Sequence, residues 1–285
     1  MKLKKVDGYS VFESMVHGFK SGFPKGSVSD NCYLLPDKIA SICSEGRLYQ
    51  IDTQSLEHLA FLADEGSFYR LYLFMQGQGP LDFDIPDKPV LAEVLYQEGR
   101  LSSQAVALMQ RLENDGFHLH KKNRQFRLPV PDRAITEKKL DTMLERCKQH
   151  GFTVTTAQSG DFEQIWNLWE EFIDPYAFVY TSRDQWQQEI RAGRLQCIKD
   201  AEGSIVAAQQ YSVEQKRSME SHIVVAPPLR GKGLAAVLLY RWLFLAAEAG
   251  CTNAFCWIAE DNPASLHLHR EFIKLNKLSA QYVRK

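Results

Sequence analysis

The sequence has no excess of charge of either sign. Lysine and arginine together number 34, aspartate and glutamate 35, and the net charge over 285 residues is −1. Binding to nucleic acid through its phosphates, or to an anionic membrane surface, requires a broad positive field. We therefore expect neither a nucleic-acid partner nor a membrane partner.

A membrane span, a secretory signal and paired cysteines are also missing. The longest apolar stretch, Gly233 to Gly250, is interrupted by Arg241 and Glu248, which favours a buried helix over a membrane span. The N-terminal segment has basic residues but no continuous apolar run. The six cysteines form no C-x-x-C pair and no metal-binding spacing, and scattered cysteines are typical of a reducing compartment. We expect a cytoplasmic protein without a metal.

The composition is typical of soluble globular proteins, with 45% apolar and 24% charged residues. The length predicts one large or two ordinary domains. Two prolines within the segment LPVPDRAI, residues 128–135, indicate a linker. We place two domains at 1–133 and 134–285, and the first of them begins with a polar lead-in that contains Gly and Ser and ends near Asp30. Both domains mix helices and strands, so the fold class is α/β with a mixed sheet.

The most informative segment is a turn between a strand and a long apolar helix. The strand is Met219–Ala226, the turn contains Arg230-Gly231-Lys232-Gly233, and the helix continues to Ala249. Glycines allow a ligand to approach the backbone, and the free N–H groups of a helix start form an anion site. The turn therefore suits a pyrophosphate, although two glycines can also simply begin a buried helix.

Three phosphate-binding motifs are candidates for this turn. A Walker loop requires Ser or Thr after its lysine, but Gly233 follows Lys232. The dinucleotide pattern G-x-G-x-x-A fits loosely, but too little chain follows it to build a doubly wound sheet. The third pattern, R-x-x-G-x-A, runs from Arg230 to Ala235.

This third pattern resembles the pyrophosphate motif Q/R-x-x-G-x-G/A of the GCN5-related N-acetyltransferase (GNAT) superfamily. The strand before it ends in Val-x-Pro, and the later segment NPASLHLH from Asn262 stands where the family has Asn-x-x-Ala-x-x-Leu-Tyr. The resemblance covers about residues 152 to 285. It implies a mixed α/β sheet and acetyl-CoA as co-substrate.

The resemblance also implies a set of cofactor-binding residues. The splayed edge of the fourth strand would pair with the pantetheine arm, and the turn would hold the pyrophosphate. Asn262 would hold the CoA arm or cap the helix at Pro263, and the proline favours capping. The implied residues are Ile223, Val224, Val225, Arg230, Gly231, Lys232, Gly233, Leu234, Ala235 and Asn262.

Three residues are candidates for catalysis. Glu220 and His222 lie two apart on the fourth strand, share a face if the strand is regular, and can act as general base. His269 stands where the family has the tyrosine that protonates the leaving thiolate, and an imidazole can do this near neutral pH. Alternatively, the first two are half-exposed strand residues and His269 is structural. The family's aromatic acceptor region corresponds to Asp174–Tyr180.

The end of the second domain departs from the family pattern. The usual Gly-Phe is replaced by Phe272-Ile273-Lys274, and the tail Leu278–Val283 has room for one short strand. A further strand from the first half is one way to complete the sheet. The first half resembles the N-terminal unit of two-part bacterial acetyltransferase-like proteins. Its turn Gln97-Glu98-Gly99-Arg100 cannot cradle a pyrophosphate, which implies a degenerate GNAT-like domain; an unrelated α+β domain is the alternative.

These observations predict two tandem acyl-CoA N-acyltransferase (GNAT)-like domains, the second of which carries the cofactor site. The predicted activity is acetyl-CoA-dependent N-acetyl transfer to a primary amine of a small molecule or protein. Two alternatives are an inactive CoA- or acyl-CoA-binding module and an aminoacyl or lipid transferase on the same fold. A homodimer is left open.

Overall fold

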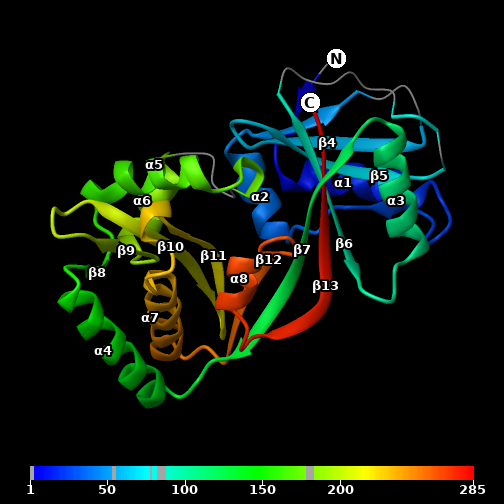
Figure 1. Cartoon of the computed structure of the whole chain (residues 1–285). Helices are drawn as coiled ribbons and strands as arrows, with labels where there is room; N and C mark the ends of the chain where they lie inside the picture. The colour runs from blue at the N-terminus through cyan, green and yellow to red at the C-terminus, as the bar shows by residue number, and fades with distance from the viewer. Residues whose placement is uncertain (1–2, 53–55, 78, 82–87, 178–182) are drawn as a thin grey trace. The chain divides into compact units, whose positions relative to one another are not determined.

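The computed structural model describes residues 3–52, 56–77, 79–81, 88–177 and 183–285. The chain forms two compact units (Figure 1). Unit 1 contains Met1–Asn123 and Asn276–Lys285, and unit 2 contains Arg124–Leu275. Both ends of the chain therefore belong to unit 1.

Unit 1 is a sheet with helices on both faces. Its strands lie in the order β1-β3-β4-β5-β6-β13, and β2 pairs with β5. The β5–β6 pair is parallel, and the other described pairs are antiparallel. The elements are β1 (Leu3–Lys5), α1 (Tyr9–Ser21), β2 (Ser29–Asp30), α2 (Pro36–Ser44), β3 (Leu48–Ile51), β4 (His58–Asp64), β5 (Tyr69–Met75), β6 (Val90–Gln97), α3 (Ser103–Asn114), β7 (His118–Pro129) and β13 (Ile273–Arg284).

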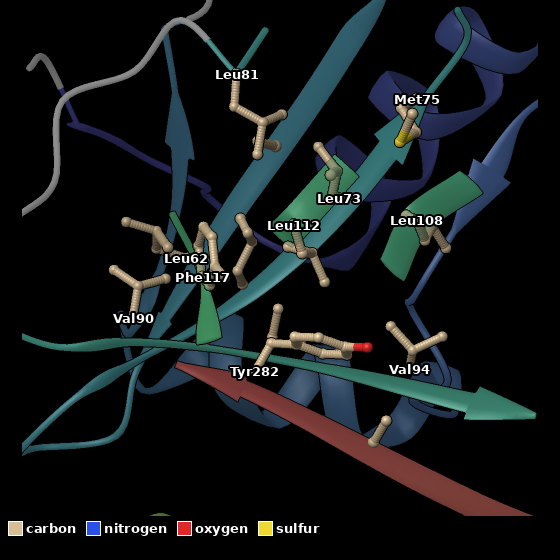
Figure 2. Packing of buried hydrophobic residues seen from close by; sticks show 14 of the residues in the cluster. Leu62, Leu73, Met75, Leu81, Val90, Val94, Leu108, Leu112, Phe117 and Tyr282 are labelled. Carbon is tan, nitrogen blue, oxygen red and sulfur yellow. The ribbon is translucent and has the colours of Figure 1, made fainter. Parts of the chain in front are cut away.

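Alternation along β5 buries apolar side chains on both faces of this sheet. Leu73 and Met75 pack in the cluster that contains α3, whereas Phe74 packs in the cluster that contains α1 and α2. Figure 2 shows Tyr282 of β13 among the residues of the α3 cluster, near Leu112. The last strand of the chain therefore contributes to the core of unit 1.

The lead-in before Asp30 contains a helix that the sequence did not lead us to expect, α1 at Tyr9–Ser21. Its apolar residues Phe12, Val16 and Phe19 have helical spacing and pack against the α1–α2 face of the sheet. Phe12 is the buried residue of α1, and the other apolar side chains of this helix are only partly buried.

Unit 2 is also a sheet between two layers of helices (Figure 1). The strand order is β7-β12-β11-β10-β9-β8. Helices α5 and α6 pack on one face, and α4 and α7 on the other. The elements are α4 (Arg133–Gln149), β8 (Thr153–Thr156), α5 (Phe162–Phe172), α6 (Arg183–Arg191), β9 (Leu195–Lys199), β10 (Ile205–Glu214), β11 (Arg217–Val225), α7 (Leu234–Glu248), β12 (Asn253–Ala259) and α8 (Pro263–Leu268).

Two irregularities of β11 shape the centre of this sheet. First, β11 pairs in parallel with β12 only from Arg217 to Glu220, and no pairing beyond Glu220 is found within the described residues. Second, His222 pairs with Gln210 and Glu220 with Tyr211 of β10, so Ser221 forms a bulge. We call the point where β11 and β12 stop pairing, at Glu220 and Cys256, the fork.

The strand order of unit 2, taken from β8 to β7, corresponds to that of unit 1, taken from β1 to β13. In each unit the described parallel pair, β5–β6 or β11–β12, lies next to the last strand of this order. Two strands, β7 and β13, have residues in both units. Residues 277–284 of β13 pair with β6 in unit 1, whereas residues 124–129 of β7 belong to unit 2, whose sheet β7 joins beside β12. The expected short final strand is wrong because β13 runs from Ile273 to Arg284. The expected further strand from the first half is confirmed.

The division into domains 1–133 and 134–285 stays a prediction, and the compact units divide the chain inside β7 and β13 instead. The proline segment lies within unit 2, between β7 and α4. The long apolar stretch forms α7, as expected. Every helix within the described ranges is too short or too polar to cross a bilayer.

Candidate functional site

The turn before α7 is built to receive an anion. Gly231 and Gly233 both have φ of +81°, and no atom lies within 4 Å of a Cβ placed on either of them. Glycine is therefore required by the backbone conformation rather than by lack of space. The backbone N–H groups of residues 231 to 236 have no hydrogen-bond acceptor in the described part of the chain. These groups point to an anion site at the start of a 15-residue helix.

A cavity of about 950 Å³ opens beside this turn. The end of β11, the turn, the first half of α7, α8 and the N-terminal half of α4 line it. Nine of the ten predicted cofactor residues are in the lining: Ile223, Val224, Val225, Arg230, Gly231, Gly233, Leu234, Ala235 and Asn262. The tenth, Lys232, lines a second cavity of about 540 Å³.

Two polar side chains of the lining are held by the fold. Arg230 donates from Nε to the carbonyl of Val225 at 3.1 Å, and its guanidinium lies 5.6 Å from the ring centre of Phe172. The amide oxygen of Asn262 accepts from the N–H of Ser265 at 3.0 Å. Asn262 therefore caps α8, as Pro263 predicts, and it also lines the cavity.

Glu220 and His269 form a buried pair at the fork. His269 Nε2 lies 2.8 Å from Glu220 Oε2, and His269 Nδ1 lies 2.9 Å from the carbonyl of Ser265. The amide of Gln209 donates to the other oxygen of Glu220. Burial lowers the pKa of His269, but the hydrogen bond and the charge of Glu220 outweigh it, and the net direction is upward. The pair therefore favours an imidazolium beside a carboxylate.

His222 lies on the opposite face of the sheet, so the expectation that it shares a face with Glu220 is wrong. Its ring centre is 6.0 Å from that of Trp169 on α5, whereas Glu220 contacts His269 next to α8. The bulge at Ser221 causes this reversal because it adds one residue between the two side chains. Burial lowers the pKa of His222 to about 4, which keeps its ring neutral near pH 7.

Cys256 adjoins the pair across the fork. Among the described residues, Glu220, Cys256 and His269 form the one cluster whose side chains could hold a metal, with donor atoms within 4.8 Å of one another. Burial and the charge of Glu220 raise the pKa of the Cys256 thiol well above its usual range. A protonated thiol and a direct histidine–carboxylate hydrogen bond account for the cluster without an ion.

The cavity lining separates the predicted cofactor residues from the predicted catalytic residues. Glu220, His222 and His269 do not line the large cavity. Conversely, Lys139 of α4 and Arg270 after α8 line it without having been expected, because nothing in the motif marks them. The apolar spacing of α4 predicts only that it packs on another element. Of the aromatic acceptor region, Tyr176 is buried, and residues 178–182 lie outside the described residues.

Residues 162–272 match the model of the acetyltransferase (GNAT) family. No curated protein matches the chain.

Several solved structures are similar to the chain in fold. A GCN5-related N-acetyltransferase from Sphaerobacter thermophilus has 12% identity and a TM-score of 0.53, with 88% of this chain and 86% of that chain covered. A GNAT-family acetyltransferase from Colwellia psychrerythraea has 12% identity and a TM-score of 0.52, with 100% of both chains covered. A tandem GNAT protein from the clavulanic acid biosynthesis pathway has 12% identity and a TM-score of 0.57, with 99% of this chain and 98% of that chain covered. At these identities the similarity shows the fold alone: two tandem GNAT-like halves.

Proposed function

Because residues 162–272 belong to the GNAT acetyltransferase family, we propose that the chain transfers the acetyl group of acetyl-CoA to a primary amine. The observation that carries the proposal is that free backbone N–H groups lie beside a cavity lined by the expected cofactor residues. The N–H groups of residues 231 to 236 have no acceptor within the described residues, and they adjoin a cavity that nine of the ten expected cofactor residues line.

In this proposal the turn binds the diphosphate of CoA, and the edge of β11 binds the pantetheine arm that links the diphosphate to the thioester. The N–H groups of residues 231 to 236 and the start of α7 receive the diphosphate, and Arg230 adds positive charge. Residues Ile223–Val225 lie beyond the fork, where β11 no longer pairs with β12. That edge can pair with the pantetheine arm as an added strand would.

The reaction requires two proton transfers and one stabilised oxyanion. The amine nitrogen bonds to the thioester carbonyl carbon, and the carbon–sulfur bond then breaks to release CoA as a thiolate. A backbone N–H at the β11 edge can stabilise the intermediate oxyanion. The amine loses a proton and the thiolate gains one. The enzyme's main contribution is positioning, because the thioester is already activated.

Glu220 and His269 are the proposed base and acid. They lie at the fork, and Glu220 is three residues before Ile223, where the part of β11 that lines the large cavity begins. The raised pKa of His269 keeps a proton available. Neither side chain lines the cavity, so they act through water or after a small rotation. His222 is the weaker candidate because a group with a pKa of about 4 is a poor base at neutral pH.

Calorimetric titration with acetyl-CoA, followed by a thiol-release assay over a panel of amines, tests the proposal. We expect binding, turnover with at least one amine, and loss of binding in the double variant Arg230→Glu, Gly233→Pro. Lys216→Glu is the control, because Lys216 lies in the turn between β10 and β11 and does not line the cavity. Absence of binding to the unaltered protein overturns the proposal.

One observation favours a second function, a CoA-binding module without catalysis. Both ring nitrogens of His269 already have partners, and its side chain is 1% exposed. Binding of acetyl-CoA without thiol release from any amine supports this function.

We further propose that unit 1 is a degenerate GNAT-like domain without a cofactor. Its strand order and its described parallel pair, β5–β6, match the strand order and the β11–β12 pair of unit 2. However, β5 ends at Met75 and β6 begins at Val90, which is too close in sequence for a helix as long as α7. A mass-spectrometric stoichiometry of one CoA per chain is expected, and two would contradict this assignment.

A further inference from the structure

Within the described part of the chain, the second cavity is lined by basic side chains and by no acidic ones. It measures about 540 Å³, and its basic side chains are Arg146, His150 and Lys232, with no carboxylate among its lining residues. It shares Met143, Gly233, Leu234 and Ala236 with the large cavity, so the two cavities meet at the start of α7. An anion bound to the N–H groups of the turn therefore has a hollow on either side.

The two cations of the turn belong to different cavities. Arg230 lines the large cavity and not the second, whereas Lys232 lines the second and not the large one. A molecule with a diphosphate at the turn and an extension into each hollow would use both. Coenzyme A has this form, because its diphosphate joins a pantetheine arm to an adenosine that carries a 3′-phosphate.

The other two basic side chains come from outside the segment that the family model matches. Arg146 lies in the last turn of α4 and His150 is its C-cap, and both precede residue 162, where the family match begins. The buried side chains of Leu140 and Cys147 fix α4 against Val237 and Leu238 of α7. The C-terminal end of α4 is therefore held beside the N-terminal end of α7 by apolar packing, independently of any ligand.

We propose that the second cavity binds the 3′-phosphoadenosine end of CoA, with the 3′-phosphate held by Arg146 and Lys232. This inference rests on the proposed function. A guanidinium can form two parallel hydrogen bonds to a phosphate, and an ammonium adds a point charge. Phe152 offers an apolar ring in the same lining for the adenine. Helix α4 thus selects CoA over coenzymes that lack the 3′-phosphate.

The test compares CoA with dephospho-CoA by calorimetric titration of the full chain. We expect the unaltered protein to bind CoA at least about tenfold more tightly, since charge-assisted bonds to the 3′-phosphate are lost with dephospho-CoA. Arg146→Gln alone reduces this preference and leaves dephospho-CoA binding within about twofold, because Arg146 lies on α4 and lines only the second cavity. The double variant Arg146→Gln, Lys232→Gln removes the preference. Lys148→Gln is the control, because Lys148 is exposed in the same helical turn and lines neither cavity.

The outcomes separate this inference from the proposed function. If the unaltered protein binds CoA and dephospho-CoA equally, the second cavity does not hold the 3′-phosphate and the inference is overturned alone. The inference, but not the proposed function, is also overturned if the double variant weakens the binding of CoA and of dephospho-CoA by the same factor. If neither ligand binds, the proposed function fails as well. Adenosine 3′,5′-bisphosphate is a second probe: CoA displaces it from the unaltered protein, and the double variant does not bind it. Unchanged thermal unfolding midpoints show that each variant is folded.

Discussion

At the scale of single residues, His269 and His222 are both buried but titrate in opposite directions. Burial disfavours the charged ring in each. His269 has the carboxylate of Glu220 at 2.8 Å, and its pKa rises. His222 packs against Trp169, and its pKa falls to about 4. The partner, rather than the depth of burial, decides the direction.

Replacing Glu220 by Gln should remove a pH-dependent part of the stability. The folded-state pKa of His269 lies above its ordinary value of about 6.5, so the pair stabilises the fold fully below that pH. This stability is lost as the pH rises through the raised pKa. We expect Glu220→Gln to lower the free energy of unfolding by about 3 kcal/mol at pH 6, and by less at pH 9. Urea denaturation at both pH values measures this, and an equal loss at both contradicts the ion pair.

His222→Phe should have the opposite effect on acid stability. The unfolded His222 takes up a proton below about pH 6.5, while the folded ring stays neutral down to about pH 4. The unaltered protein therefore loses about 2 kcal/mol from this group between pH 7 and pH 5. The variant should gain that amount relative to the unaltered protein over the same range. Urea denaturation at the two pH values measures it, and no relative gain would show that His222 is solvated in the fold.

At the scale of elements, the left-handed glycines at the two ends of α7 provide a matched pair. Gly233 has φ of +81° and Gly250 has φ of +71°, both with open space around an added Cβ. Alanine should cost about 1 kcal/mol of stability at either position. Only Gly233→Ala should weaken acetyl-CoA binding, because only Gly233 lines the cavities. Thermal unfolding and titration of both variants measure this, and equal affinities contradict a binding role for the turn.

The helix α4 depends on its buried face and not on its exposed ion pair. Leu140 is 5% exposed and packs in the cluster with Leu238, so Leu140→Ala should cost about 2–4 kcal/mol. Arg133 pairs with Glu248, but their side chains are 58% and 39% exposed. Arg133→Ala should therefore cost less than about 1 kcal/mol. Chemical denaturation measures both variants, and a reversed order would contradict the packing of α4.

How much of these elements the sequence predicts depends on the kind of signal. The strand–turn–helix around Arg230 is predictable because glycines, cations and an apolar run mark it locally. The bulge at Ser221 has no side-chain signature, since it is a one-residue change in backbone pairing. Arg146 lines its cavity only through the packing of α4 on α7, which no local pattern encodes. The sequence therefore indicates the turn that we propose as the diphosphate site but not the pairing of Glu220 with His269.

At the scale of the whole molecule, unit 1 needs both ends of the chain. Lys277 to Arg284 pair with β6, and Tyr282 is buried in the α3 cluster. A chain that stops after Leu275 should lose the amide protection of β6 while β9 and β10 stay protected. Hydrogen–deuterium exchange measures this, and removal of Lys285 alone is the control. Full protection of β6 in the shortened chain would contradict the role of β13.

The order of the two units in the sequence also limits the order in which they can finish folding during synthesis. In most proteins the N-terminal domain is the first to fold during synthesis. Here unit 2 is one continuous segment, and all of it has been made once Leu275 is joined to the nascent chain. Unit 1 precedes unit 2 in the sequence, yet the residues of its last strand, β13, that pair with β6 are translated after the whole of unit 2. The unit that is started first is therefore completed second, and until β13 has been translated the β6 edge lacks its β13 partner.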